Sequence, residues 1–196
     1  MEKQLILFLW AYILPLNVVR LIGHFFIHYF RKLGLVSLFL YLLFWIFCFF
    51  MVFSNSRLFL TGSVFIPNIL LQIIGAIFFL LGLILQILTI KLMGLKTLLG
   101  IPEIVPAQYR AQLVVKGPFS LVRHPIYLGQ LLCILGTFLF TSELSLAILF
   151  FIVSILFWPV AILEERELIE RFGEEYLAYR KRVPMIFSTF KLQKKL

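Results

Sequence analysis

The sequence predicts an all-α, polytopic membrane protein with about five transmembrane helices. Hydrophobic residues make up 62% of the 196 residues and charged residues only 14%, which is too apolar for a soluble domain of this length. Five runs of mostly apolar residues approach the length of about 20 residues that spans a bilayer. The chain length suits a single domain over residues 1–196, whose first 90 residues would hold three membrane helices.

The apolar runs define the predicted helices in chain order. The first run contains Pro15, Asn17 and Arg20 and lacks a small-residue cleavage site, so we expect it to stay as a membrane helix rather than act as a cleavable signal. The fourth and fifth runs are separated only by Ser142 and Glu143, so a tight antiparallel hairpin is expected there. The predicted helices cover residues 5–22, 35–53, 64–90, 126–141 and 144–163.

The distribution of basic residues predicts the orientation of the chain. If the loop 91–123 is cytoplasmic, alternation of the helices places residues 20–34 and the tail after Leu163 on the same side. Of the 18 Lys and Arg residues, all but Lys3 and Arg57 then face the cytoplasm, which predicts an outside N-terminus and a cytoplasmic C-terminus. The net charge of +9 could suggest nucleic acid, but most of the basic residues sit in two segments that flank apolar runs, as membrane orientation produces. The lipid bilayer is therefore an expected partner and nucleic acid is not.

The tail after Leu163 has the pattern of a helix. Apolar residues recur there at intervals of three and four, so a cytoplasmic C-terminal helix is expected, with Gly173 as a weak point and Pro184 beyond its end. The residues that form this pattern are Leu168, Ile169, Phe172, Tyr176 and Tyr179.

Cysteine and histidine do not indicate a metal site. Cys48 and Cys133 both lie in apolar runs, so we expect packing residues rather than a disulfide or a metal pair. His24 and His28 are one helical turn apart, as metal ligands can be, but no third ligand accompanies them in the sequence. No metal is therefore expected.

Two boundaries between lipid and water carry ionisable residues. The stretch LVVKGPFSLVRHPIYLG, residues 113–129, places Arg123 and His124 at the start of the fourth helix, and the fifth apolar run ends at Glu164 and Glu165. Ionisable side chains at a membrane boundary are costly to desolvate and are therefore candidates for a site. Because both boundaries are predicted to face the cytoplasm, the cationic and anionic clusters are expected to meet and bind one zwitterionic cofactor.

Each cluster also has a simpler interpretation. Arg123 and His124 stand beside a helix N-terminus, which favours a carboxylate, but Arg123 is equally explained as an interfacial anchor. Glu164 and Glu165 would close the fifth helix, where acids oppose the helix dipole unless a cation lies nearby. They are also explained as the solvated start of the tail helix, paired with neighbours such as Arg166.

The stretch LVVKGPFSLVRHPIYLG, followed by LEERELIERFGEEYLAYRKRVP, resembles the paired signature of the isoprenylcysteine carboxyl methyltransferase family, integral membrane enzymes that use S-adenosylmethionine. The resemblance covers roughly residues 113–184 and implies that residues 91–196 form a cofactor-binding, catalytic half with its active site on the cytoplasmic side. It implies that Glu164 holds the ammonium of the cofactor, and Arg123 is expected to orient a carboxylate or the substrate. The implied cofactor-binding residues are Ala111, Gln112, Leu113, Val114, Phe119, His124, Pro125, Ile126, Tyr127, Glu164 and Glu165.

The sequence departs from the family at two positions. Phe119 stands where the family usually has Tyr, and Val160 stands where the prenylcysteine enzymes have an arginine that interacts with the substrate. The tail and the GLKTLLG segment look more like bacterial relatives, including methanethiol S-methyltransferases. The expected methyl acceptor is therefore small or lipophilic, such as a thiol, a prenylcysteine carboxylate or a lipid, and enters between helices from the bilayer.

Two other functions compete with methyl transfer. A sterol-type membrane reductase that uses NADPH shares an RHP-x-Y element, but Ile126 replaces its usual Asn, and adjacent acids do not suit a dinucleotide phosphate. A noncatalytic membrane scaffold would bind no cofactor at all. The methyltransferase hypothesis predicts that His124 and Glu164 approach one cavity from opposite sides, separated by about the length of the cofactor's amino-acid end.

Overall fold

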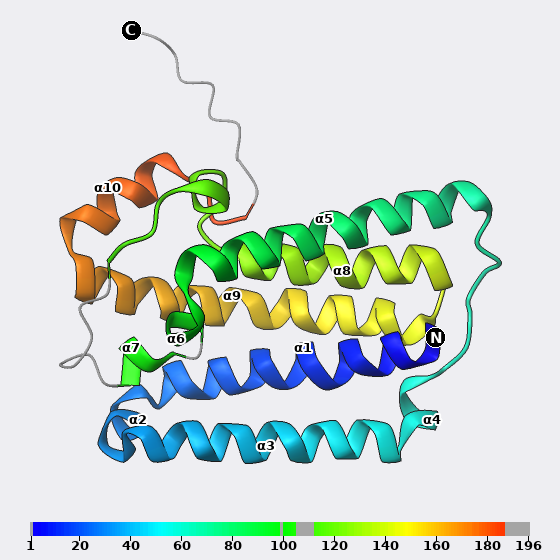
Figure 1. Ribbon diagram of the computed structural model, residues 1–196, viewed down its shortest axis with the longest axis horizontal. Helices are drawn as coiled ribbons and strands as arrows, with labels where there is room; N and C mark the ends of the chain where they lie inside the picture. The colour runs from blue at the N-terminus through cyan, green and yellow to red at the C-terminus, as the bar shows by residue number, and fades with distance from the viewer. Residues whose placement is uncertain (1, 99, 105–111, 187–196) are drawn as a thin grey trace, which may run out of the picture.

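The computed structural model describes residues 2–98, 100–104 and 112–186, and it is built from helices in these ranges (Figure 1). The class predicted from the sequence, all-α, is confirmed. The elements are α1 (Glu2–Phe25), α2 (Ile27–Leu33), α3 (Leu35–Ser54), α4 (Ser56–Phe59), α5 (Ile69–Met93), α6 (Leu95–Leu98), α7 (Ile101–Ile104), the 3-10 helix η2 (Gly117–Ser120), α8 (Pro125–Thr141), α9 (Leu144–Phe172) and α10 (Glu174–Arg182).

The axes of the five long helices lie roughly parallel to one another (Figure 1). The helices pack side by side in the order α3, α1, α9, α8, α5. At one end of this bundle lie α2, α6, α7 and α10, together with the junction that precedes α8 (Figure 1). The start of α1 and the turn between α8 and α9 lie at the opposite end. The described parts of the segments predicted to be cytoplasmic therefore gather at one end of the molecule.

Four helices in the described part of the chain are long and apolar enough to cross a membrane, namely α1, α3, α5 and α9. The apolar helix α8 has 17 residues, at the short end of the range of about 17–25 that spans a bilayer. An integral membrane protein is therefore confirmed, and a fifth span through α8 stays a prediction.

Two predicted helix boundaries were wrong. The third predicted helix began at residue 64, but α5 begins at Ile69 because Asn68 caps it, accepting a hydrogen bond of 2.9 Å from the backbone of Leu71. The fifth predicted helix ended at residue 163, but α9 continues to Phe172. Glu164 and Glu165 therefore lie inside a helix and do not oppose the dipole at its end.

Other local predictions are confirmed. The turn between α8 and α9 consists of Ser142 and Glu143 alone, with Ser142 in the left-handed region at φ 57°. The tail helix breaks at Gly173, which has φ 53° between α9 and α10, and Pro184 lies beyond the end of α10. Cys48 and Cys133 are free thiols.

Glycines allow α5 and α8 to pack closely. A Cβ atom added to Gly136 of α8 would lie 2.4 Å from the backbone nitrogen of Phe79 and 2.5 Å from the carbonyl oxygen of Gly75. The same crossing repeats seven residues along each helix, where a Cβ atom on Gly82 would lie 2.6 Å from the carbonyl oxygen of Gly129. Small residues at such positions let membrane helices approach until their backbones touch.

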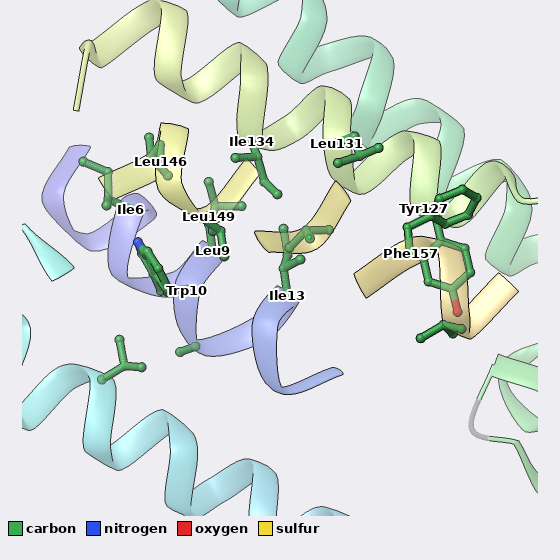
Figure 2. Packing of buried hydrophobic residues seen from close by; sticks show 14 of the residues in the cluster. Ile6, Leu9, Trp10, Ile13, Tyr127, Leu131, Ile134, Leu146, Leu149 and Phe157 are labelled. Carbon is green, nitrogen blue, oxygen red and sulfur yellow. The ribbon is translucent and has the colours of Figure 1, made fainter. Parts of the chain in front are cut away.

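The apolar core lies between α1, α8 and α9, and Figure 2 shows its side chains from these three helices. Ile134, Leu146 and Leu149 are fully buried there. A polar pair crosses the same interface, because the Asn17 amide of α1 donates a hydrogen bond of 3.1 Å to Gln130 of α8, and both side chains are fully buried. The pair ties the first predicted membrane helix to the fourth one, far away in sequence.

We predict that Gly136→Ala destabilises the bundle, because its new methyl group would meet backbone atoms of α5 that cannot move independently. The expected loss is about 1–3 kcal/mol, the usual cost of overpacking. Thermal unfolding in detergent should show it as a lower melting temperature. The control is Leu80→Ala in α5 of the same helix pair. Leu80 is 54% exposed, so this variant should melt close to the wild type. Equal melting temperatures for the two variants would contradict the role of the glycines.

Candidate active site

A cavity of about 660 Å³ opens inside the bundle at the end that carries the two predicted boundaries. The segment before α8 and the helices α1, α3, α5, α9 and α10 all contribute to its lining. The predicted cofactor residues that line it are Gln112, Leu113, Val114, Phe119, His124, Pro125, Ile126, Tyr127 and Glu164, and Arg123 lines it as well. Glu165 is not part of the lining, and Ala111 lies outside the described residues.

The Glu164 carboxylate faces the cavity, and donors from two other helices surround it. The Tyr127 hydroxyl donates a hydrogen bond to its Oε1 atom. Oε2 lies 3.3 Å from Nδ1 of His124, and Oε1 lies 3.4 Å from Nε2 of His24 and 3.9 Å from Arg20. Segments that are more than a hundred residues apart in sequence therefore meet at one carboxylate.

Glu165 does not line the cavity, and it holds the tail instead. Its Oε1 atom accepts hydrogen bonds from the Arg123 guanidinium, with distances of 2.7 and 2.8 Å, and its Oε2 atom lies 3.2 Å from Arg180 of α10. Arg123 also donates to the backbone carbonyls of Arg180 and Val183. The Arg123 and Glu165 side chains are only 9% and 4% exposed, so this is a buried clamp between α8, α9 and the tail.

His124 bridges the two acids. It precedes the first turn of α8 as the N-cap residue, and its Nδ1 and Nε2 atoms each lie 3.3 Å from a carboxylate oxygen, of Glu164 and Glu165 respectively. Burial lowers the pKa of the His124 imidazole, but the hydrogen bonds and charges of the two glutamates outweigh burial and raise this pKa above its usual value of about 6.5. A protonated ring can donate from both nitrogens to these two oxygens.

The predicted separation of His124 and Glu164 was wrong. We expected the length of a cofactor's amino-acid end between them, but the two side chains touch. The reason is that α9 does not end at the acids. Because the helix continues for two more turns, Glu164 stays packed against the start of α8 instead of projecting from a free helix end.

Three residues of the site were missed by the sequence analysis. Arg20 and His24 of α1 and Glu167 of α9 line the cavity. Nδ1 of His24 lies 2.7 Å from Oε1 of Glu167, and the Arg20 guanidinium lies over the Tyr127 ring at 5.2 Å. A signal was present, because Arg20 and His24 are spaced by four residues and Glu164 and Glu167 by three, which places each pair on one helix face.

The cavity continues into an apolar and aromatic part between α1 and α3. Its walls there include Tyr12 and Leu16 of α1 and Leu38, Tyr41 and Trp45 of α3. The site thus has a charged end beside Glu164 and an apolar end deeper in the bundle. Both the N-terminal helices and the half predicted to bind the cofactor, residues 91–196, contribute to it.

The model of the phospholipid methyltransferase family matches residues 70–175, from α5 to the start of α10. The chain belongs to this family. The matched range contains both the segment before α8 and the acids of α9. The predicted resemblance to the isoprenylcysteine carboxyl methyltransferases is confirmed by the relatives described next.

Curated relatives of this family member match about two fifths of its chain. A methanethiol S-methyltransferase of Bradyrhizobium diazoefficiens is 38% identical over 85 residues, 43% of this chain and 27% of the relative. A protein-S-isoprenylcysteine O-methyltransferase of Schizosaccharomyces pombe is 38% identical over 73 residues, 37% of this chain and 31% of the relative. The nickel-cobalt-cadmium resistance protein NccN of Alcaligenes xylosoxydans is 32% identical over 81 residues, 41% of this chain and 38% of the relative. The matches thus span about a third of each relative, and no solved structure matches significantly.

We predict that Arg123→Ala releases the tail, because it leaves Glu165 buried without its main partner. Removing one partner of a buried ion pair lowers the stability of the folded protein by about 3–5 kcal/mol. Hydrogen exchange should show faster exchange in α10 and in residues 183–186. The exposed Lys181→Ala variant, also in α10, serves as the control and should exchange like the wild type. Unchanged protection in Arg123→Ala would contradict the clamp.

A second prediction concerns pH. Because the folded protein holds the His124 proton more tightly than the unfolded chain, this residue contributes stability that is complete below a pH of about 6.5 and is lost as the pH rises through the raised pKa. The melting temperature of the wild type should therefore fall more steeply above about pH 6.5 than that of His124→Asn. Thermal unfolding over a series of pH values measures this, and equal slopes would contradict it.

Proposed function

We propose that the protein is an integral membrane methyltransferase that uses S-adenosylmethionine and methylates a small or lipophilic acceptor. The observation that carries the proposal is the single cavity onto which both family motifs converge, with Glu164 and His124 at its charged end. The family match supports methyl transfer over an NADPH-dependent reductase and over a noncatalytic scaffold.

The residues around the cavity fit the chemical groups of the cofactor. The Glu164 carboxylate suits an ammonium, and the Arg20 guanidinium suits a carboxylate, and both line the cavity within 3.9 Å of each other. The rings of Tyr127 and Phe119 offer aromatic faces, which attract a sulfonium. The cavity volume of about 660 Å³ lies inside the range of about 300–1,000 Å³ for small-molecule pockets.

Bound S-adenosylmethionine would supply an electrophilic methyl group on its sulfonium. The chain's own residues would then act by orientation and exclusion of water. Tyr127, His124 and His24 hold Glu164 in place, and the apolar walls keep bulk water from the acceptor side. Alignment of two reactants in a dry site can supply most of the rate of such a displacement.

The acceptor is proposed to occupy the apolar part of the cavity between α1 and α3. The names of relatives include enzymes that act on methanethiol and on protein-S-isoprenylcysteine. At the position of the substrate arginine of the prenylcysteine enzymes this chain has Val160, which is fully buried. A thiol entering from the bilayer is therefore favoured over a carboxylate.

The proposed orientation places this site on the cytoplasmic side, with the N-terminus outside and the C-terminus in the cytoplasm. Its support is the excess of Lys and Arg in the segments at the cavity end of the bundle. The proposal treats residues 1–196 as one functional domain, because α1 and α3 of the first 90 residues help to line the cavity.

Isothermal titration calorimetry on the purified protein with S-adenosylmethionine, S-adenosylhomocysteine and NADPH tests this proposal. We expect the two nucleosides to bind and NADPH not to bind. Glu164→Gln should weaken binding of S-adenosylhomocysteine by about tenfold or more, because a desolvated charge pair with the ammonium is lost. Glu170→Gln, an exposed acid on the same helix, is the control and should bind like the wild type. Binding of NADPH alone, or equal affinities of the two variants, would contradict the proposal.

A further inference from the structure

His24 of α1 is held between two carboxylates of α9, and the two contacts are unequal. Nδ1 lies 2.7 Å from Oε1 of Glu167, which is the length of a charge-assisted hydrogen bond. Nε2 lies 3.4 Å from Oε1 of Glu164, which is longer than an ordinary N–H···O bond. Glu167 therefore holds the ring at Nδ1 through the shorter of these two contacts.

The environment of Glu167 favours a protonated ring beside it. The Glu167 side chain is 9% exposed, and its Oε2 atom is buried without a hydrogen-bond partner among the residues that the structure describes. Leaving a buried acceptor unpaired is costly, so its negative charge is balanced best by a cation on the adjacent imidazole. His24, Glu164 and Glu167 all line the cavity.

We propose that His24 accepts the proton of a thiol acceptor during methyl transfer, and that Glu167 is its positioning residue. This inference rests on the function proposed above and makes its substrate class specific. The S–H bond of the thiol breaks and its proton goes to Nε2 of His24. The sulfur of the acceptor forms a bond to the methyl carbon, the bond from that carbon to the sulfonium breaks, and its electron pair stays on the sulfur of S-adenosylhomocysteine.

The arrangement also links the proton on Nε2 to ligand binding. In the protein alone, Glu164 attracts a proton on Nε2 from one side while Glu167 holds Nδ1 from the other. Glu164 loses this attraction when an ammonium group pairs with it, whereas the bond to Glu167 stays. We therefore expect His24 to release a proton when the ligand binds, which leaves a neutral ring held by Glu167.

Any test has to distinguish the contribution of His24 from those of the other charged groups near it. Arg20 lies one turn earlier on α1 and contacts Glu164, and Tyr127 and His124 of α8 contact the other sides of the same carboxylate. The cavity wall also contains Arg171, Tyr41, Tyr176 and Tyr179. Because none of these groups replaces Nε2, substitutions at His24 and Glu167 identify its contribution.

A base is needed only for some acceptors. An alkanethiol is mostly protonated at neutral pH, since free thiols have a pKa of about 8.5 or higher, and its thiolate is the nucleophile. A carboxylate acceptor is already ionised at that pH. The proposal therefore commits to a thiol.

The experiment compares His24→Asn with His28→Asn. In the first variant the amide nitrogen of the new side chain takes the place of Nδ1 and can still donate to Glu167, so only the reactive nitrogen is lost. His28 is exposed and does not line the cavity, so it is the matched control. Three quantities are measured: affinity for S-adenosylhomocysteine, protons released on that binding from calorimetry in two buffers, and the rate of methyl transfer to 1-butanethiol and to the more acidic thiophenol.

We expect His24→Asn to bind S-adenosylhomocysteine still but to release fewer protons on binding than the wild type. Transfer to 1-butanethiol should fall by about 100-fold or more, the usual contribution of a general base, and transfer to thiophenol should fall less. His28→Asn should match the wild type in every respect. Unchanged proton release, equal losses for the two thiols, or transfer by the wild type to a prenylcysteine carboxylate but not to thiols would overturn the proposal.

Glu167→Gln provides a second test that holds even if His24→Asn does not fold. It keeps an oxygen for Nδ1 but removes the charge that stabilises the imidazolium. The rise of kcat/KM with pH for 1-butanethiol should move to lower pH by about one unit. An unmoved midpoint would overturn the role of His24. If the wild type binds neither nucleoside and transfers no methyl group, the proposed function itself fails, a result distinct from those above.

Discussion

Two adjacent carboxylates inside one helix hold the cavity end of this protein together. Glu164 and Glu165 follow each other on α9, so their side chains leave the helix in different directions and meet different partners. Glu164 contacts donors from α1 and from the start of α8, and Glu165 contacts Arg123 and the tail. Buried charges are stable only when they are fully paired, so each of these segments depends on the others.

The rest of the bundle sets the geometry of this cluster. The glycine contacts fix the approach of α5 to α8, and the apolar core joins α8 to α1 and α9. The buried Asn17 and Gln130 pair lies between the core and the charged end. As a consequence the N-terminus of α8, which carries His124, is held against the middle of α9. The cavity is bounded by elements that the packing already holds in place.

Much of this could be predicted from the sequence, because local patterns carry the information. Long apolar runs gave the membrane helices, the two residues between the fourth and fifth runs predicted the hairpin, and the LVVKGPFSLVRHPIYLG stretch identified a wall of the cavity. The end of α9 was predicted too early because hydropathy marks only where the apolar run ends. The helix continues beyond that point through the polar residues of the tail. Arg20 and His24 were missed as site residues because their partners lie more than 140 residues further along the chain. The role of Arg123 as a clamp on Glu165 and the tail needed the same long-range information.

The central claim is that the cavity between α1, α8 and α9 receives the amino-acid end of a methyl-donating nucleoside at Glu164. An experimental structure of the protein with S-adenosylhomocysteine tests this most directly. We predict density for the ligand between the segment before α8 and Glu164, with its ammonium at the carboxylate and its sulfur toward the apolar part between α1 and α3. Density for the ligand on another surface, or an amino-acid end that points away from Glu164, would contradict the account.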